Sequence, residues 1–161
     1  MKYDRIHFTN GSSEDCFNVS RPVGYKAANL PEDVMLVQAM LKLIASYSRN
    51  AAGLDDPNYN IPEITGSIDA DTYSAIGQFQ IAHRDQLLTF DDRIDPAHYK
   101  GRRISKSGRR FMTITLLHFY AVDAALMIGK SQSEFVLYQP ALESLDARMV
   151  SLFDAALMKI R

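Results

Sequence analysis

The 161-residue chain has little cysteine, almost no net charge and no long uninterrupted apolar run, and each shortage excludes a class of protein. A single cysteine, Cys16, cannot form an intramolecular disulfide framework or a cysteine-rich metal site. The formal net charge of −1 gives the whole molecule no attraction for nucleic acid or anionic membranes. Hydrophobic residues make up 47% of the chain, which is enough for a packed core, so we expect one globular domain.

The sequence predicts neither a secretory signal nor a membrane span. Residues 1–8 contain no continuous apolar stretch of the length that a signal peptide requires. The most apolar stretch, residues 111–128, contains His118 and Asp123, and an ionised aspartate inside a bilayer is costly. We therefore expect a buried core helix there and a protein that is cytoplasmic as synthesised. Delivery to the periplasm or cell wall would need a non-classical route.

Helical periodicity dominates the middle of the chain. Pro31 suits a first helical position, and the apolar residues after it recur at spacings of three and four, which predicts a helix over residues 31–48. A second helix is expected from a cap at Asp69 or Asp71 to about residue 88. A third is expected over residues 110–128.

These patterns predict a mainly all-α single domain spanning residues 1–161. An extended arm covers residues 1–28, within which residues 3–9 are a candidate strand. A compact helical core covers residues 29–128. A helical extension covers residues 129–161, with helices expected near 133–138 and from 140 to 160.

Charge is unevenly distributed, with an acidic region over residues 55–95 followed by a basic loop at 99–110. The basic loop lacks interleaved aromatic residues and any nucleic-acid-binding motif, so we expect no nucleic-acid partner. A solvated loop is the simplest interpretation. Docking of an acidic partner, of a phosphate-bearing envelope polymer or of a second copy's acidic region is the alternative. Its bases are Lys100, Arg102, Arg103, Lys106, Arg109 and Arg110.

Two of the expected helices carry the same short pattern, an apolar residue followed by glutamine. The first contains Val37-Gln38 and the second contains Phe79-Gln80. Gly66 and Thr72 frame the turn before the second helix, and the turn Asp91-Asp-Arg-Ile-Asp-Pro96 follows it. The repeated order of helix, glutamine and turn is more specific than any one of its parts.

This order resembles the peptidoglycan-binding-domain family, a small three-helix module of bacterial cell-wall hydrolases and related envelope proteins. That family combines an acid–Val–x–x–Val–Gln–x–x–Leu helix, a Gly–x–Ile/Phe–x–x–x–Thr turn, an Ala–Ile/Val–x–x–Phe–Gln helix and an Asp–Gly–x–Ile/Val–x–Pro turn. The match covers residues 19–97 and departs at Asp92, where the family has glycine, and at the inserted basic loop. It implies a three-helix core and peptidoglycan or muropeptide fragments as ligands. The matching motif residues are Val37, Gln38, Gly66, Thr72, Phe79 and Pro96.

The chemistry of the motif residues is structural before it is functional. Glycine at position 66 permits a backbone conformation that other residues adopt at a cost. The two glutamines can bond turn carbonyls and amides and so tie each helix to a neighbouring loop, or they can contact a ligand directly. A ligand on the helix-and-turn surface would meet polar groups, of which the candidates are Asn29, Asp69, Gln80 and Arg84.

The sequence contains no recognisable catalytic, metal or cofactor site. It has no His-Glu-x-x-His pattern, and its four histidines are scattered. The resemblance implies a peptidoglycan-binding protein, associated with a secretion system or a cell-wall hydrolase, and the absence of these patterns leads us to expect that it is non-catalytic. The alternative is a protein-interaction module, acting as adaptor, chaperone or immunity-type partner of a secreted effector or of the secretion apparatus.

Overall fold

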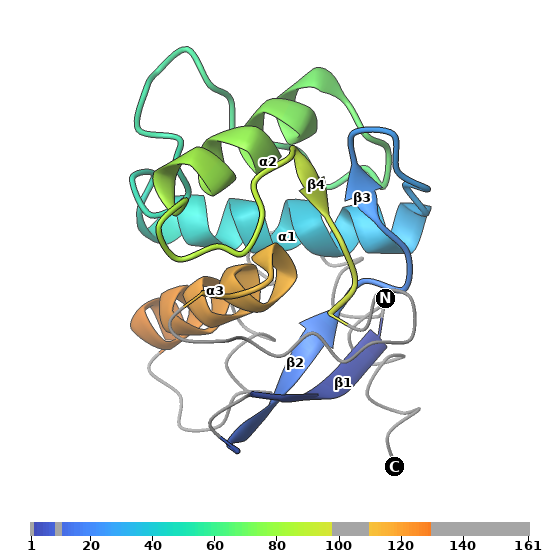
Figure 1. Cartoon of the computed structure of the whole chain (residues 1–161). Coiled ribbons are helices and arrows are strands. Elements are labelled where there is room, and N and C mark those ends of the chain that lie inside the picture. Colours follow the sequence, from blue (N-terminus) through green and yellow to red (C-terminus); the bar gives the residue numbers. More distant parts are fainter. Residues whose placement is uncertain (1, 9–10, 98–109, 130–161) are drawn as a thin grey trace.

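A computed structural model describes residues 2–8, 11–97 and 110–129 (Figure 1). The basic loop up to Arg109 and the expected helices near 133–138 and 140–160 lie outside these residues. In order along the chain, the elements are β1 (Lys2–His7), β2 (Ser13–Asn18), β3 (Val23–Gly24), α1 (Pro31–Tyr47), α2 (Ala70–Ala82), β4 (Arg93–Ile94) and α3 (Thr113–Gly129).

The prediction of a mainly all-α fold is wrong, because the described residues form two small antiparallel sheets beside three helices. β1 pairs with β2 as a hairpin, and β3 pairs with β4. The extended arm predicted for residues 1–28 is thus mostly sheet. Ser13–Asn18 lacks the alternation of polar and apolar residues that marks a half-buried strand, and two-residue strands are too short to leave any periodic pattern.

Helix α1 lies at the centre of the fold, with α2 and the β3–β4 sheet on one side and α3 with the hairpin on the other (Figure 1). It is buried on more than one face. Val34 and Leu41 belong to the predicted apolar stripe, yet Leu36 and Leu43, outside that stripe, are equally buried. A helix that is apolar nearly all round is typical of a core position.

The three helices predicted within the described residues are present, but α2 ends earlier than expected. Its start is as predicted, since the Asp69 carboxylate caps it by accepting the N–H of Thr72 at 2.7 Å. It ends at Ala82 rather than near residue 88, because His83 has non-helical angles and its ring bonds the Ala51 carbonyl at 2.8 Å. Farther along, Leu88 and Phe111 share a backbone hydrogen bond that no helix would permit.

Helix α3 packs against both α1 and strand β2. At the contact with β2, the Phe17 N–H donates to Nδ1 of His118 at 3.3 Å, and both residues are buried. Burial lowers the pKa of His118 from 6.5 to about 4, so the ring is neutral at physiological pH. None of the helices in the described residues has the length and apolar character needed to cross a bilayer.

Candidate functional site

Gln38, on the central helix α1, is buried and holds the turn that precedes α2. Its Nε2 lies within hydrogen-bond distance of Thr65 Oγ1, the Ser67 carbonyl and Thr72 Oγ1, at 3.2, 2.9 and 2.9 Å. Its Oε1 accepts the N–H groups of Thr65 and Gly66, each at 2.9 Å. One side chain therefore satisfies a whole turn whose backbone groups would otherwise need other partners.

Gln80 repeats this arrangement one helix later. Its Nε2 donates to the Arg93 carbonyl at 2.8 Å and to Thr113 Oγ1 at 3.0 Å, and its Oε1 accepts the Asp92 N–H at 2.8 Å. In both cases the side-chain oxygen holds a residue with positive φ, 77° at Gly66 and 58° at Asp92. In both cases the nitrogen reaches a threonine in the first turn of the next helix. Each glutamine thus fastens its own helix to the following turn and to the next helix.

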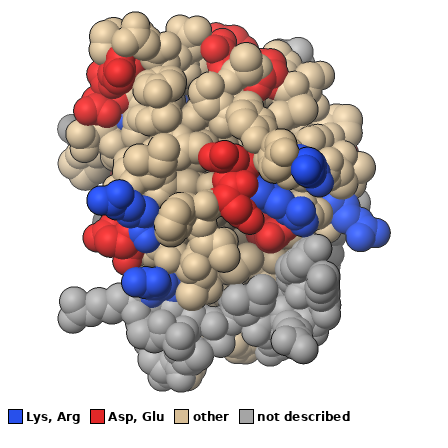
Figure 2. All heavy atoms as spheres, turned by 45° about the horizontal axis from the view of Figure 1, so that its top comes forward, with Lys and Arg blue, Asp and Glu red and all other residues tan. Residues whose placement is uncertain are grey.

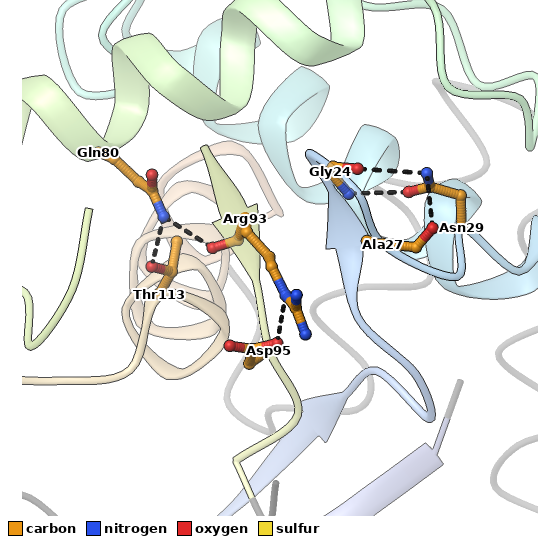
Figure 3. A network of polar contacts seen from close by, with 7 residues as sticks. All are labelled: Gly24, Ala27, Asn29, Gln80, Arg93, Asp95 and Thr113. Carbon is orange, nitrogen blue, oxygen red and sulfur yellow. Dashed lines mark hydrogen bonds and ion pairs between the residues drawn. The ribbon is translucent and has the colours of Figure 1, made fainter. Parts of the chain in front are cut away.

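Asn29 performs a similar task on the other side of the β3–β4 sheet. Its Oδ1 accepts the Gly24 N–H at 2.8 Å, while its Nδ2 donates to the carbonyls of Gly24 and Ala27 at 3.2 and 3.3 Å. Gly24 is the register partner of Arg93, which Gln80 holds. Asn29 and Gln80 therefore clamp the two members of one strand pair from opposite sides (Figure 3).

The pairing of β3 with β4 fixes the backbone positions of Asp92 and Tyr25, which flank the paired residues. The Asp92 carbonyl accepts the Tyr25 N–H at 2.9 Å, and its own N–H is held by Gln80. Gly24 has a φ of 114°, and a β-carbon there would stand 2.3 Å from the Asp92 carbonyl oxygen, so only glycine permits this approach. Asn29 and Gln80 thus fix the backbone next to Tyr25, which lies at the protein surface.

We call this surface the Tyr25 surface and define it by Tyr25, Lys26, Tyr73 and Asp92. The rings of Tyr25 and Tyr73 meet edge to face, with centroids 6.3 Å apart and planes at 76°. Tyr25 is 50% exposed, and the Lys26 ammonium lies 4.9 Å from its ring centroid. An exposed tyrosine packed on a half-buried one, with a lysine ammonium over the exposed ring, gives this surface an apolar body with polar groups at its edge.

The Asp92 carboxylate lies close enough to Tyr73 for its charge to act on the phenol. Desolvation, followed by the charges of Asp92 and Tyr25, raises the pKa of the Tyr73 phenol above its ordinary 10.0. The hydroxyl is therefore protonated and remains a hydrogen-bond donor at neutral pH. The Asp92 carboxylate also lies against Gly77, one helical turn beyond Tyr73, where a β-carbon would stand 2.8 Å from Oδ1.

The sequence-derived ligand candidates do not form one cluster. Asn29 and Gln80 use their side-chain polar atoms within the fold, at the β3–β4 sheet. Asp69 is exposed and caps α2 one turn before Tyr73. Arg84 is exposed beyond the opposite end of the helix, about 20 Å from Asp69 along the axis at 1.5 Å per residue. The structure therefore associates Asn29, Asp69 and Gln80 with the Tyr25 surface and leaves Arg84 apart from it.

The remaining motif residues have structural surroundings. Val37 and Phe79 are fully buried in the core, and Pro96 is buried after β4. Gly66 packs against α1, since a β-carbon there would stand 3.2 Å from the Pro31 carbonyl oxygen. Of the basic loop only Arg110 is described, and it is exposed.

Charged side chains form small separate groups of both signs on the face that Figure 2 shows, among mostly uncharged residues. Over residues 2–8, 11–97 and 110–129, no three His, Cys, Asp or Glu side chains lie close enough together to hold a metal ion. Cys16, the one cysteine of the sequence, is buried in β2. The Tyr25 surface combines two aromatic rings, an ammonium and a carboxylate.

Sequence reasoning missed three members of the Tyr25 surface, namely Tyr25, Lys26 and Tyr73. Tyr25 and Tyr73 are 48 positions apart, and no local pattern links a residue after a two-residue strand with one in a helix. Asp92 was the one available signal, because an aspartate stands there where the resembled family has glycine. Comparisons with protein families, with curated proteins and with solved structures found no match for this chain.

Proposed function

We propose that this chain is a non-catalytic peptidoglycan-binding protein. The observation that carries the proposal is the equivalence of Gln38 and Gln80, each of which joins its helix to a positive-φ turn residue and to a threonine of the next helix. These are the positions on which the resemblance to the peptidoglycan-binding-domain family depends. The equivalence gives the repeated sequence pattern a common structural purpose.

The charge distribution of the protein bears on how such binding should behave. With a net charge of −1, the chain has no general electrostatic attraction for an anionic polymer. Binding to the wall should therefore depend on specific contacts. It should survive an increase in salt that screens interactions between exposed charges.

Co-sedimentation with purified, insoluble peptidoglycan sacculi tests the proposal. The protein is mixed with sacculi at low salt and at physiological salt, and its distribution between pellet and supernatant is measured. We expect it in the pellet under both conditions and expect soluble muropeptides to release it. Chitin supplies a control for adsorption to any insoluble amino-sugar polymer.

Two results would contradict the proposal in different ways. Protein that remains wholly in the supernatant at low salt would exclude wall binding. If protein that does not sediment with sacculi co-purifies from cells with one protein partner in stoichiometric amount, the adaptor or immunity-type function would replace the proposal of wall binding.

A further inference from the structure

We infer that the Tyr25 surface is the ligand-contact site of this protein and that it binds an amino-sugar ring whose attached peptide carries a carboxylate. The inference rests on the proposed function and adds to it the site and the chemical groups that are recognised. It assigns a role to Tyr25, Lys26 and Tyr73, which are not among the matching motif residues, and to Asp92, where the resembled family has glycine.

The tyrosine pair supplies the contact for the sugar ring. A pyranose ring is amphipathic, with C–H groups on its faces and polar groups at its edge. C–H groups pack favourably against the electron-rich face of an aromatic ring. Because Tyr25 and Tyr73 meet at 76°, they form a corner that offers a ring face and a ring edge together. Tyrosines also have few rotatable bonds, so ordering them on binding costs little entropy.

The charged groups supply the polar part of the recognition. The Lys26 ammonium lies over the Tyr25 ring, 4.9 Å from its centroid, and can meet a carboxylate of the stem peptide there. The Asp92 carboxylate lies against α2 at Gly77 and can accept from a sugar hydroxyl or acetamido N–H. A surface that combines tyrosine rings with a cation and a carboxylate acceptor matches a ligand that has an apolar ring face, a carboxylate and an N–H donor.

The fold holds the backbone of this surface in place before any ligand arrives. Asn29 holds Gly24, Gln80 holds Asp92, and the Asp92 carbonyl holds the N–H of Tyr25. Asp92 keeps a φ of 58° although the position would suit glycine better. A non-glycine residue kept in this conformation at a candidate site is consistent with selection for its side chain. Gln80 and Asn29 are therefore positioning residues here.

Isothermal titration calorimetry with two soluble probes tests the inference. The first probe is a muropeptide, a disaccharide with its acidic stem peptide. The second is a chitooligosaccharide, which has amino sugars but no peptide. The test variants are Tyr25→Ala, Tyr73→Ala and Lys26→Gln. Tyr47→Ala is a matched control, because Tyr47 is 49% exposed at the end of α1, and Arg84→Gln is the control for loss of a cation. Thermal unfolding verifies that each variant is folded.

We expect each tyrosine variant to bind the muropeptide about five- to thirtyfold more weakly than the unaltered protein, with both controls unchanged. Lys26→Gln should weaken muropeptide binding and leave chitooligosaccharide binding the same. If the protein binds the muropeptide and the tyrosine variants bind as tightly as Tyr47→Ala, the site is elsewhere and the proposed function stands. If Lys26→Gln weakens both probes equally, the carboxylate contact is wrong. If the unaltered protein binds neither sacculi nor muropeptide, the proposed function fails first.

Discussion

The backbone N–H of Asp92 donates to Oε1 of Gln80 across 2.8 Å, and Asp92 holds a φ of 58° while it does so. Gln38 makes the same contact with Gly66, whose φ of 77° costs a glycine nothing. The two turns are thus built alike, but one carries a side chain in a conformation that L-residues adopt at a cost. The Asp92 carboxylate is what the second turn has and the first lacks.

The first prediction concerns a trade between stability and binding at Asp92. Asp92→Gly should stabilise the fold by about 0.5–1 kcal/mol, because glycine removes the left-handed strain at the cost of some unfolded-chain entropy. The same variant should bind muropeptide more weakly, because the Tyr25 surface loses its carboxylate. Urea unfolding and calorimetry on one preparation measure both effects. A variant that is less stable than the unaltered protein would contradict the strain argument.

The second prediction compares the two glutamines. Replacing Gln38 by alanine leaves the N–H groups of Thr65 and Gly66 without their acceptor, and should cost about 3 kcal/mol or more. Gln80→Ala removes the acceptor from only Asp92, and should cost about 1–3 kcal/mol. Equilibrium urea unfolding gives both values. An equal decrease in the free energy of unfolding for both variants would show that the Gln38 contacts stabilise the fold no more than those of Gln80.

Gln80→Ala has a further consequence if it acts as a positioning residue for the Tyr25 surface. The variant should bind muropeptide more weakly at temperatures where it is fully folded. Gln80→Glu keeps the acceptor for the Asp92 N–H and should retain more of the binding than alanine does. Binding that is unaffected in both folded variants would show that Gln80 is structural only.

The sequence predicts the elements of this fold that leave a local signal, such as a helical period or a capping residue. The period of about 3.6 residues after Pro31 identifies α1, and the acid at Asp69 marks the start of α2, because both signals are local. Strands β3 and β4 are stabilised by pairing across about 70 residues, and two residues are too few to show alternation. The end of α2 was missed because the ring contacts of His83 come from Ala51 and Tyr120, far away in the sequence.

The candidate site divides in the same way. The repeated Val-Gln and Phe-Gln pairs can be recognised in the sequence, because each consists of a residue of a helix's apolar stripe and the glutamine after it. They therefore identify the glutamines that hold the two turns. The corner of Tyr25 and Tyr73 is not visible, because it exists only after β3 and β4 pair. Sequence therefore located the supports of the surface and not the surface itself.

The third prediction follows from the buried His118. Its pKa is about 4 in the folded protein and 6.5 when exposed, so the unfolded chain binds a proton between these values and the folded chain does not. The stability contributed by keeping this ring neutral is fully present above pH 6.5 and is lost as the pH falls towards 4. The total loss is about 3 kcal/mol. Protonation would also disrupt the hydrogen bond that Nδ1 accepts from Phe17.

A neutral replacement isolates this contribution from the titration of the carboxylates. His118→Gln should be less stable than the unaltered protein at pH 7.5, because the aromatic packing with Phe17 is lost. Its stability should then fall less steeply between pH 6.5 and 4. Free energies of unfolding across this range, measured for both proteins, give the difference. Parallel curves would show that His118 does not contribute to the acid sensitivity.

The fourth prediction uses two glycines with similar backbone angles and different surroundings. Gly53 has a φ of 74°, and a β-carbon there would stand 2.5 Å from the carbonyl oxygen of Gln78 in α2. Gly11 has a φ of 86°, with nothing within 4 Å of the same position. Gly11→Ala should therefore cost about 1 kcal/mol, from backbone strain alone. Gly53→Ala should cost about 3 kcal/mol or more, because the new β-carbon would meet backbone atoms of α2 and could be accommodated only if the loop moved away from the helix. Urea unfolding of both variants gives the comparison, and equal losses would mean that the loop around Gly53 does not pack on α2 as closely as described.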